Sequence, residues 1–161
     1  MDVALSQGQK APAFSLSDQD GGTVKLADFK GRRLLIYFYP KADTPGCTTQ
    51  SCAVRDARHD MKKLKLNVVG ISQDAPADQK KFDVKFSLGF PLLADVDHAV
   101  AEAYGVWGDK SMYGKTYKGI IRSSFLIDEK GVVQRAWYKV KPEDTVPLAR
   151  EALEELDGTP G

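Results

Sequence analysis

The distribution of apolar residues along the chain predicts alternating strands and helices. Leu34 to Pro40 (LLIYFYP) is a continuous apolar run, which is typical of a central strand covered on both faces, and residues 67–72 have the same character. Residues 47–64 carry apolar side chains on one helical stripe, which indicates a helix. Further helices are predicted over residues 77–86, 96–104 and 142–156, and further strands over 120–128 and 132–140 with a tight turn at 129–131.

The order of these elements predicts the architecture. Residues 14–26, with Gly21 and Gly22 at their centre, indicate an N-terminal hairpin, and residues 91–93 form a short extended piece. Strands alternate with helices at first, and a hairpin and a closing helix follow. This order predicts a mixed sheet with helices on both faces. We therefore expect residues 1–161 to form one α/β domain, a three-layer α/β/α sandwich around a central mixed β-sheet.

Composition excludes several classes of protein. The 161 residues are 42% hydrophobic and 28% charged, which is typical of a packed globular chain. The 23 Lys and Arg residues nearly balance the 22 Asp and Glu residues, which argues against binding to nucleic acid or to a membrane surface. No apolar stretch approaches the length of a membrane span, and the first ten residues lack the pattern of a secretory signal.

The two cysteines and two histidines narrow the chemistry further. A pair of cysteines five positions apart is too few for a disulfide framework and suggests a reducing compartment, so we expect a cytoplasmic protein. Two scattered histidines leave little for a transition-metal site, and we expect neither a metal nor a cofactor. Asp95 and Asp97 could form a cation site, but capping of the helix that follows them is the commoner role of such a pair.

Residues 38–56 (FYPKADTPGCTTQSCAVRD) carry the candidate chemistry. The predicted strand ends at Pro40, and Thr44 followed by Pro45 predicts a helix start, with the threonine as cap and the proline as first helical residue. Cys47 then lies in the first turn, where unpaired N–H groups and the helix dipole favour an anion. Because helix N-termini are among the positions that stabilise thiolates, Cys47 is a candidate reactive thiolate.

Helical spacing predicts different surroundings for the two cysteines. At about 100° per residue, Cys47 points within about 20° of the core-facing stripe, whereas Cys52 points about 160° away from that stripe, toward solvent. In a regular helix their α-carbons would lie about 8.6 Å apart, whereas a disulfide usually needs about 4.4–6.8 Å. A Cys47–Cys52 bond would therefore require the first helical turn to unwind. On composition alone, a pair of inert, buried cysteines explains the residues equally well.

Several segments resemble a known family. Pro40, Thr44 and Cys47 in PKADTPGC match the P-x-x-x-T/S-x-x-C signature of the peroxiredoxins. Residues 11–21, 104–108 and 115–128 resemble the bacterioferritin-comigratory, or Q-type, subgroup, so that the resemblance extends over nearly the whole chain. It implies a thioredoxin-like fold and the reduction of hydroperoxides by a cysteine thiolate.

The resemblance also implies roles for individual residues. Cys47 matches the peroxidatic cysteine, whose thiolate attacks a peroxide oxygen and becomes a sulfenic acid. The hydroxyl of Thr44 and the backbone N–H groups of Gly46 and Cys47 would face the two peroxide oxygens. Arg122 matches the arginine that the family uses and lies on a predicted apolar strand, where a charge is costly without a partner. The Cys47 thiolate would be that partner. Pro40 would end the strand and shield the thiolate from bulk water.

Cys52 resembles the resolving cysteine of the subgroup with C-x4-C spacing, which would form an intramolecular disulfide with Cys47 after local unwinding. By resemblance, the reductant of this disulfide is thioredoxin or a glutaredoxin, and the protein is a monomer. Gln50 stands where many relatives carry Glu, at a position from which its side chain could hydrogen-bond near the thiolate or Arg122.

Two other functions remain open at this stage. A thioredoxin-type oxidoreductase acting on proteins would use the same fold, but it usually carries C-x-x-C rather than C-x4-C. A redox sensor would use the same sulfenic acid and disulfide to change a partner. Turnover separates these functions, because a peroxidase consumes many equivalents of peroxide and a sensor stops after one.

Overall fold

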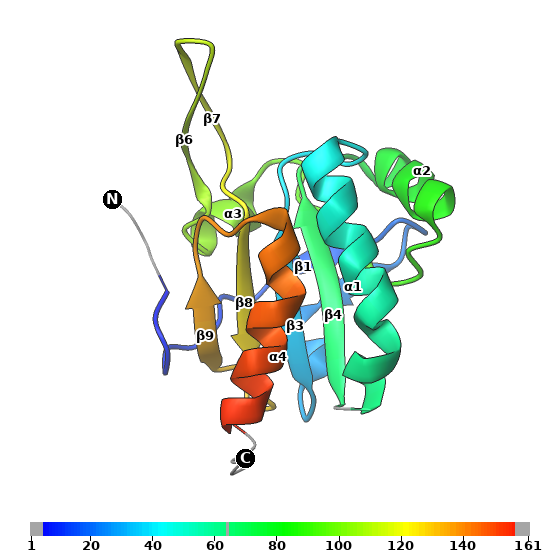
Figure 1. The fold of residues 1–161 in the computed structure, drawn as a ribbon, viewed down its shortest axis with the longest axis vertical. Coiled ribbons are helices and arrows are strands. Elements are labelled where there is room, and N and C mark those ends of the chain that lie inside the picture. Colours follow the sequence, from blue (N-terminus) through cyan, green and yellow to red (C-terminus); the bar gives the residue numbers. More distant parts are fainter. Residues whose placement is uncertain (1–4, 64, 157–161) are drawn as a thin grey trace.

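The computed structural model describes residues 5–63 and 65–156 (Figure 1). Within these residues, a seven-stranded sheet has the strand order β2-β1-β5-β4-β3-β8-β9. The strands are β1 (Ser15–Ser17), β2 (Thr23–Lys25), β3 (Arg33–Phe38), β4 (Leu66–Ser72), β5 (Leu92–Ala94), β8 (Ser123–Ile127) and β9 (Val133–Trp137). The pairs β3–β4 and β4–β5 are parallel and the other pairs are antiparallel, so the sheet is mixed, as predicted.

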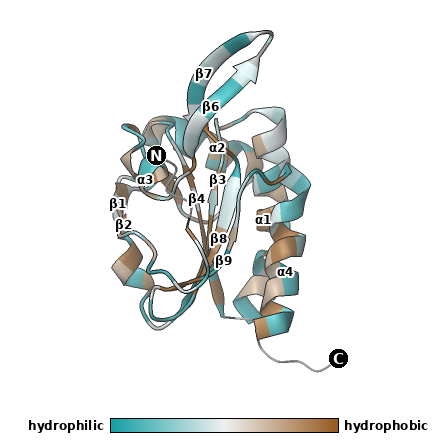
Figure 2. Cartoon of the chain, turned by 90° about the vertical axis from the view of Figure 1, so that its left-hand side faces the viewer, coloured by the Kyte–Doolittle hydropathy of each residue, from teal (hydrophilic) through white to brown (hydrophobic). Residues whose placement is uncertain are grey.

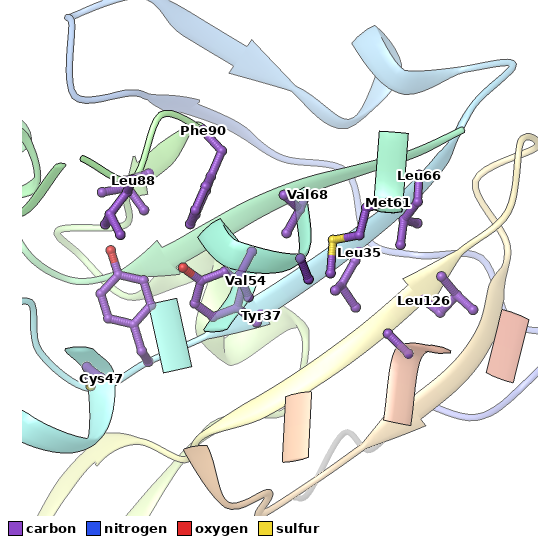
Figure 3. Packing of buried hydrophobic residues seen from close by; sticks show 14 of the residues in the cluster. Leu35, Tyr37, Cys47, Val54, Met61, Leu66, Val68, Leu88, Phe90 and Leu126 are labelled. Carbon is purple, nitrogen blue, oxygen red and sulfur yellow. The ribbon is translucent and has the colours of Figure 1, made fainter. Parts of the chain in front are cut away.

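Helices cover both faces of this sheet. They are α1 (Pro45–Lys63), α2 (Pro76–Phe86), α3 (Ala99–Ala103) and α4 (Thr145–Leu156), with short 3₁₀ helices η1 (Leu26–Phe29) and η2 (Pro142–Asp144). Alternate residues of β3 point to opposite faces, because side chains alternate along a strand. Leu35 and Tyr37 pack with α1, α2 and α4 (Figure 3), whereas Leu34 and Ile36 pack with α3 and the N-terminal segment.

The predicted fold class is confirmed: the chain has a thioredoxin-like α/β fold with a central mixed sheet. The N-terminal hairpin is also present, as β1 and β2. Element boundaries differ modestly, because α3 is shorter than predicted and the closing helix begins as η2 before α4. The last residue of the helix predicted over 47–64 lies outside the described residues. Within the described part of the chain, no helix is both long and apolar enough to cross a bilayer.

A second, two-stranded sheet was not predicted. Strands β6 (Trp107–Met112) and β7 (Lys115–Ile120) form a hairpin that projects from one end of the molecule (Figure 1). Figure 2 shows hydrophilic to neutral colours along it, and most of β7 is exposed. The hairpin therefore lacks the apolar alternation that identifies a strand packed on a core.

The strand predicted over 120–128 is present as β8, but it begins only at Ser123, so Arg122 lies just before it and not on a strand. Ile120 ends β7, residues 121 and 122 form a connection, and β8 begins at Ser123. The N–H of Ile121 donates to the Val106 carbonyl (2.7 Å), and the Arg122 carbonyl accepts from Val140 N–H (2.9 Å). These bonds hold the chain where it turns from the projecting hairpin into the central sheet.

The aspartate pair before α3 caps the helix. The buried carboxylate of Asp95 accepts hydrogen bonds from the N–H groups of Val100 (3.1 Å) and Ala101 (2.8 Å). Asp97 accepts from Ala99 N–H (3.2 Å) at the surface. Burial raises the pKa of Asp95, while the two backbone bonds act in the opposite direction. The capping interpretation is therefore confirmed.

Removing this cap should destabilise the protein. In Asp95→Ala, two buried N–H groups lose their acceptor, and each such loss costs about 1–3 kcal/mol, so we expect the free energy of unfolding to fall by about 2–4 kcal/mol. Urea denaturation followed by circular dichroism measures this change. Asp97→Ala is the matched control and should cost less than about 0.5 kcal/mol, because that carboxylate is exposed. Equal losses in the two variants would contradict the assignment.

Candidate active site

Cys47 lies in the first turn of α1, beyond the carboxyl end of β3. Helix α1 begins at Pro45, as predicted, and Thr48 N–H donates to the Thr44 carbonyl (2.8 Å). The Cys47 side chain is only 1% exposed and lies at one end of the buried cluster drawn in Figure 3. The sulfur is thus recessed at a helix N-terminus, where the first N–H groups have no partner within the helix.

The Arg122 guanidinium lies against this sulfur. Its Nη2 is 3.4 Å from Cys47 Sγ, and its Nη1 donates to Gln50 Oε1 at 2.5 Å. Gln50 is fully buried, and its own Nε2 donates to Thr145 Oγ1 (2.8 Å) at the start of α4. The two residues that the sequence placed near the thiolate therefore meet there.

The position of Arg122 depends on Gly46. A Cβ atom built on Gly46 would lie 2.9 Å from Arg122 Nη2 and 3.4 Å from Pro142 Cγ. The first contact is closer than real Cβ atoms allow, so any side chain here would displace the guanidinium. Glycine at this position therefore lets the guanidinium lie over the first turn of α1.

Thr44 and Pro40 flank the site from the preceding loop. The Thr44 hydroxyl donates to the Lys41 carbonyl (2.8 Å), which commits its proton and leaves its oxygen as an acceptor. Both residues are half-buried, and β3 has already ended at Phe38, two residues before Pro40.

Beneath the cysteine, Tyr37 of β3 shares a hydrogen bond with Ser51 of α1 (2.8 Å between their oxygens). Both side chains are fully buried. Burial raises the pKa of Tyr37 far above its ordinary value, with Ser51 acting against this shift and Cys47 adding to it. The phenol is therefore neutral and adds no charge near the sulfur.

Cys52 does not face solvent as predicted. Its side chain is half-buried and packs against the same core cluster as Cys47. The helical projection placed Cys52 on the side of Arg55, whose Nη1 donates to the Phe86 carbonyl at the end of α2 (2.7 Å). That side of α1 therefore meets α2, a neighbour that the periodicity of α1 alone does not reveal. Both cysteines are free thiols within one continuous helix.

Sequence reasoning missed two residues of the site. Thr145 holds Gln50, and Lys110 of β6 donates to the Ile120 carbonyl (2.9 Å) two residues before Arg122. Burial and the Arg122 charge lower the pKa of Lys110, and Cys47 acts in the opposite direction. The position of Thr145 near the start of the predicted closing helix was a weak indication of a hydrogen-bonding role. Lys110 lies in a polar segment whose sequence gives no indication that its side chain is near the site.

Two other features of the described residues lie outside this site. A cavity of about 280 Å³ is lined by Leu34 at the start of β3 and by Gly131, so it lies at the opposite end of β3 from Cys47. Among residues 5–63 and 65–156, no group of three His, Cys, Asp or Glu side chains is placed to hold a metal ion.

Comparison with known proteins agrees with this arrangement. Residues 7–136 match the AhpC/TSA family. Peroxiredoxin Bcp of Escherichia coli is 53% identical over 133 residues, which cover 83% of this chain and 85% of the relative.

Two solved structures have the same fold. Bacterioferritin comigratory protein of Xanthomonas campestris superposes with a TM-score of 0.86 and 34% identity, covering 94% of this chain and 99% of that one. Peroxiredoxin Q of the same organism has a TM-score of 0.83 and 37% identity, covering 88% of this chain and 90% of that one. The chain therefore belongs to the AhpC/TSA family and, within it, to the Bcp/PrxQ peroxiredoxins, which are thiol peroxidases.

Proposed function

We propose that this peroxiredoxin reduces hydrogen peroxide and organic hydroperoxides through the Cys47 thiolate, with Cys52 as the resolving cysteine and thioredoxin or a similar dithiol protein as reductant. The observation that carries the proposal is the 3.4 Å contact between Arg122 Nη2 and a recessed Cys47 sulfur at a helix N-terminus. Cation and helix terminus together stabilise the nucleophile that the reaction needs.

In the first step, the Cys47 thiolate attacks the terminal oxygen of the peroxide. The S–O bond forms as the O–O bond breaks, the sulfur is oxidised to a sulfenic acid, and the leaving oxygen takes up a proton from solvent and departs as water or an alcohol. Arg122 and the N–H groups of Gly46 and Cys47 are the donors for the charge that develops on the leaving oxygen. Thr44, whose proton is committed to Lys41, accepts the O–H of the incoming hydroperoxide.

In the second step, the Cys52 thiol attacks the sulfenic sulfur, an S–S bond forms and water leaves. The first turns of α1 must unwind for this step, because two α-carbons five residues apart in a helix are separated by about 8.6 Å. Cys52 is half-buried against the core, so unwinding is also what exposes it to a reductant. The sulfenic acid and Cys52 thus remain apart until the helix opens.

In the third step, a dithiol protein reduces the disulfide by thiol–disulfide exchange and returns both cysteines to thiols. Thioredoxin is the class of reductant we propose, with a glutaredoxin as the alternative, in a reducing cytoplasm. An intrachain pair needs no second subunit to complete the cycle, so the proposed active form is the monomer. The Xanthomonas relative is described as having alkyl peroxide reduction activity, which supports organic hydroperoxides as substrates here.

The two-cysteine mechanism makes a direct mass-spectrometric prediction. After one equivalent of hydrogen peroxide, the wild-type protein should lose two hydrogens, because both thiols become a disulfide. Cys52→Ser should instead gain one oxygen at Cys47, trapped as a sulfenic acid with dimedone, and Cys47→Ser should not react. With thioredoxin, its reductase and NADPH, the wild type should consume many equivalents of peroxide. A Cys47 that stays a thiol in every variant would overturn the proposal.

Gln50 provides a test of the charge balance at the site. Its amide oxygen accepts from Arg122 without neutralising that charge, whereas a carboxylate at this position would pair with the guanidinium and place a negative charge near the thiolate. The neutral amide thus leaves the full positive charge of Arg122 for Cys47.

We expect Gln50→Glu to move the midpoint of the pH profile for Cys47 alkylation upward by about 0.5 pH unit or more. Iodoacetamide labelling in a Cys52→Ser background measures this profile. Gln50→Met is the comparison, since it removes the hydrogen bonds of Gln50 to Arg122 and Thr145 without adding charge and should shift the midpoint less. If both variants shift it equally, geometry rather than charge is responsible.

A further inference from the structure

The β6–β7 hairpin brings a second cation to the site. The hairpin projects from the same end of the sheet at which α1 begins (Figures 1 and 2). Most of β7 is exposed, and the hairpin ends in Tyr113, which is 97% exposed. Lys110 of β6 is an exception, because it is half-buried and its ammonium group points back toward the base of the hairpin, where Ile120 lies.

Gly119 leaves the space in which the Lys110 side chain lies. Gly108 of β6 lies directly opposite Gly119 of β7. A Cβ atom on Gly119 would come within 3.1 Å of Lys110 Cδ, so the aliphatic part of the lysine crosses the hairpin over this glycine. The same Cβ would lie 3.6 Å from the Tyr117 ring. The absence of a side chain at position 119 therefore leaves room for Lys110 to reach the Ile120 carbonyl.

The ammonium group holds the chain that carries Arg122. Lys110 Nζ donates to the Ile120 carbonyl at 2.9 Å. The next two carbonyls are also occupied, that of Ile121 by the Ser123 hydroxyl (2.9 Å) and that of Arg122 by Val140 N–H (2.9 Å). Three consecutive carbonyl groups thus have three separate donors, and the one supplied by Lys110 is the charged donor. Hydrogen bonds from charged donors are stronger than those between neutral groups.

The protonation of Lys110 responds to the same surroundings. Burial lowers its pKa, the like charge of Arg122 lowers it further, and the Cys47 sulfur acts in the opposite direction. The geometric link is the Ile120 carbonyl, which accepts from Lys110 Nζ and lies two residues before Arg122, whose guanidinium contacts Cys47 Sγ. Tyr37, which faces Cys47 from β3, is neutral because burial raises its pKa, so it does not offset the two cations.

We propose that Lys110 is a positioning residue of the peroxidase reaction. It anchors the segment from Ile120 to Arg122, and its positive charge, together with that of Arg122, stabilises the Cys47 thiolate. The inference rests on the proposed role of Cys47 as the peroxide-reactive thiolate. It assigns a function to the hairpin, which delivers the lysine to a site formed otherwise by α1, η2 and the connection before β8.

The test compares four variants in a Cys52→Ser background. Lys110→Gln removes the charge, Lys110→Arg retains it, and Lys118→Gln removes an exposed cation from the same hairpin as the matched control. Gly119→Val leaves every charge in place but fills the space beside the Lys110 aliphatic chain, because even a Cβ atom there would lie 3.1 Å from Lys110 Cδ. The rate of Cys47 oxidation by hydrogen peroxide is followed by stopped-flow fluorescence as a function of pH, and circular dichroism verifies folding.

Loss of the Lys110 charge should raise the midpoint of the pH–rate profile by about 0.5 pH unit or more, which slows the reaction below that midpoint about threefold. Lys110→Arg should restore most of the rate, Gly119→Val should shift the midpoint in the same direction as Lys110→Gln, and Lys118→Gln should match the Cys52→Ser parent. A purely structural lysine would leave the midpoint unchanged.

A Lys110→Gln profile that coincides with the parent profile would overturn the inference, as would a Lys110→Arg variant as impaired as Lys110→Gln. If Lys110→Gln does not fold, an unchanged midpoint in Gly119→Val overturns it instead. These failures differ from failure of the proposed function, in which the parent protein itself shows no oxidation at Cys47.

Discussion

The site is organised around a half-buried guanidinium that keeps its charge next to a buried sulfur. Placing a charge away from water is costly unless its hydrogen-bonding groups find partners. Arg122 finds them in Cys47 Sγ and the neutral amide of Gln50, which in turn is held by Thr145 of α4. Gly46 leaves the space that the guanidinium occupies. Each neighbour thus satisfies the cation or makes room for it without neutralising it.

The same helix has two opposed tasks in the proposed mechanism. Its intact first turn presents N–H groups to the sulfur, yet the two cysteines can join only when that part of the helix opens. Gln50 and Ser51 lie between the cysteines, and both are buried. Gln50 is hydrogen-bonded to Arg122 and Thr145, and Ser51 is hydrogen-bonded to Tyr37. Opening must break these bonds. The contacts that stabilise the reactive state therefore also set the barrier to forming the disulfide.

Prediction from sequence succeeded for elements whose burial and boundaries are set by residues close along the chain. The apolar run that became β3 is buried on both faces, and the Thr44-Pro45 signal marked the start of α1. It failed where a neighbour distant in sequence decides the outcome. Cys52 was expected at the surface, but α2 approaches that side of the helix. The β6–β7 hairpin was missed, since an exposed two-stranded sheet needs no apolar alternation.

The sequence by itself determined the fold class, the helix start beneath Cys47 and, through the family signature, the residues to examine, because these depend on periodicity and on residues close along the chain. Only the tertiary structure decided which charges surround the sulfur. Arg122 reaches the sulfur from the connection between β7 and β8, 75 residues beyond Cys47, and Lys110 lies over Gly119 and holds the Ile120 carbonyl of the same segment, 63 residues beyond Cys47. Electrostatic effects depend on distance in space, which local sequence patterns do not encode.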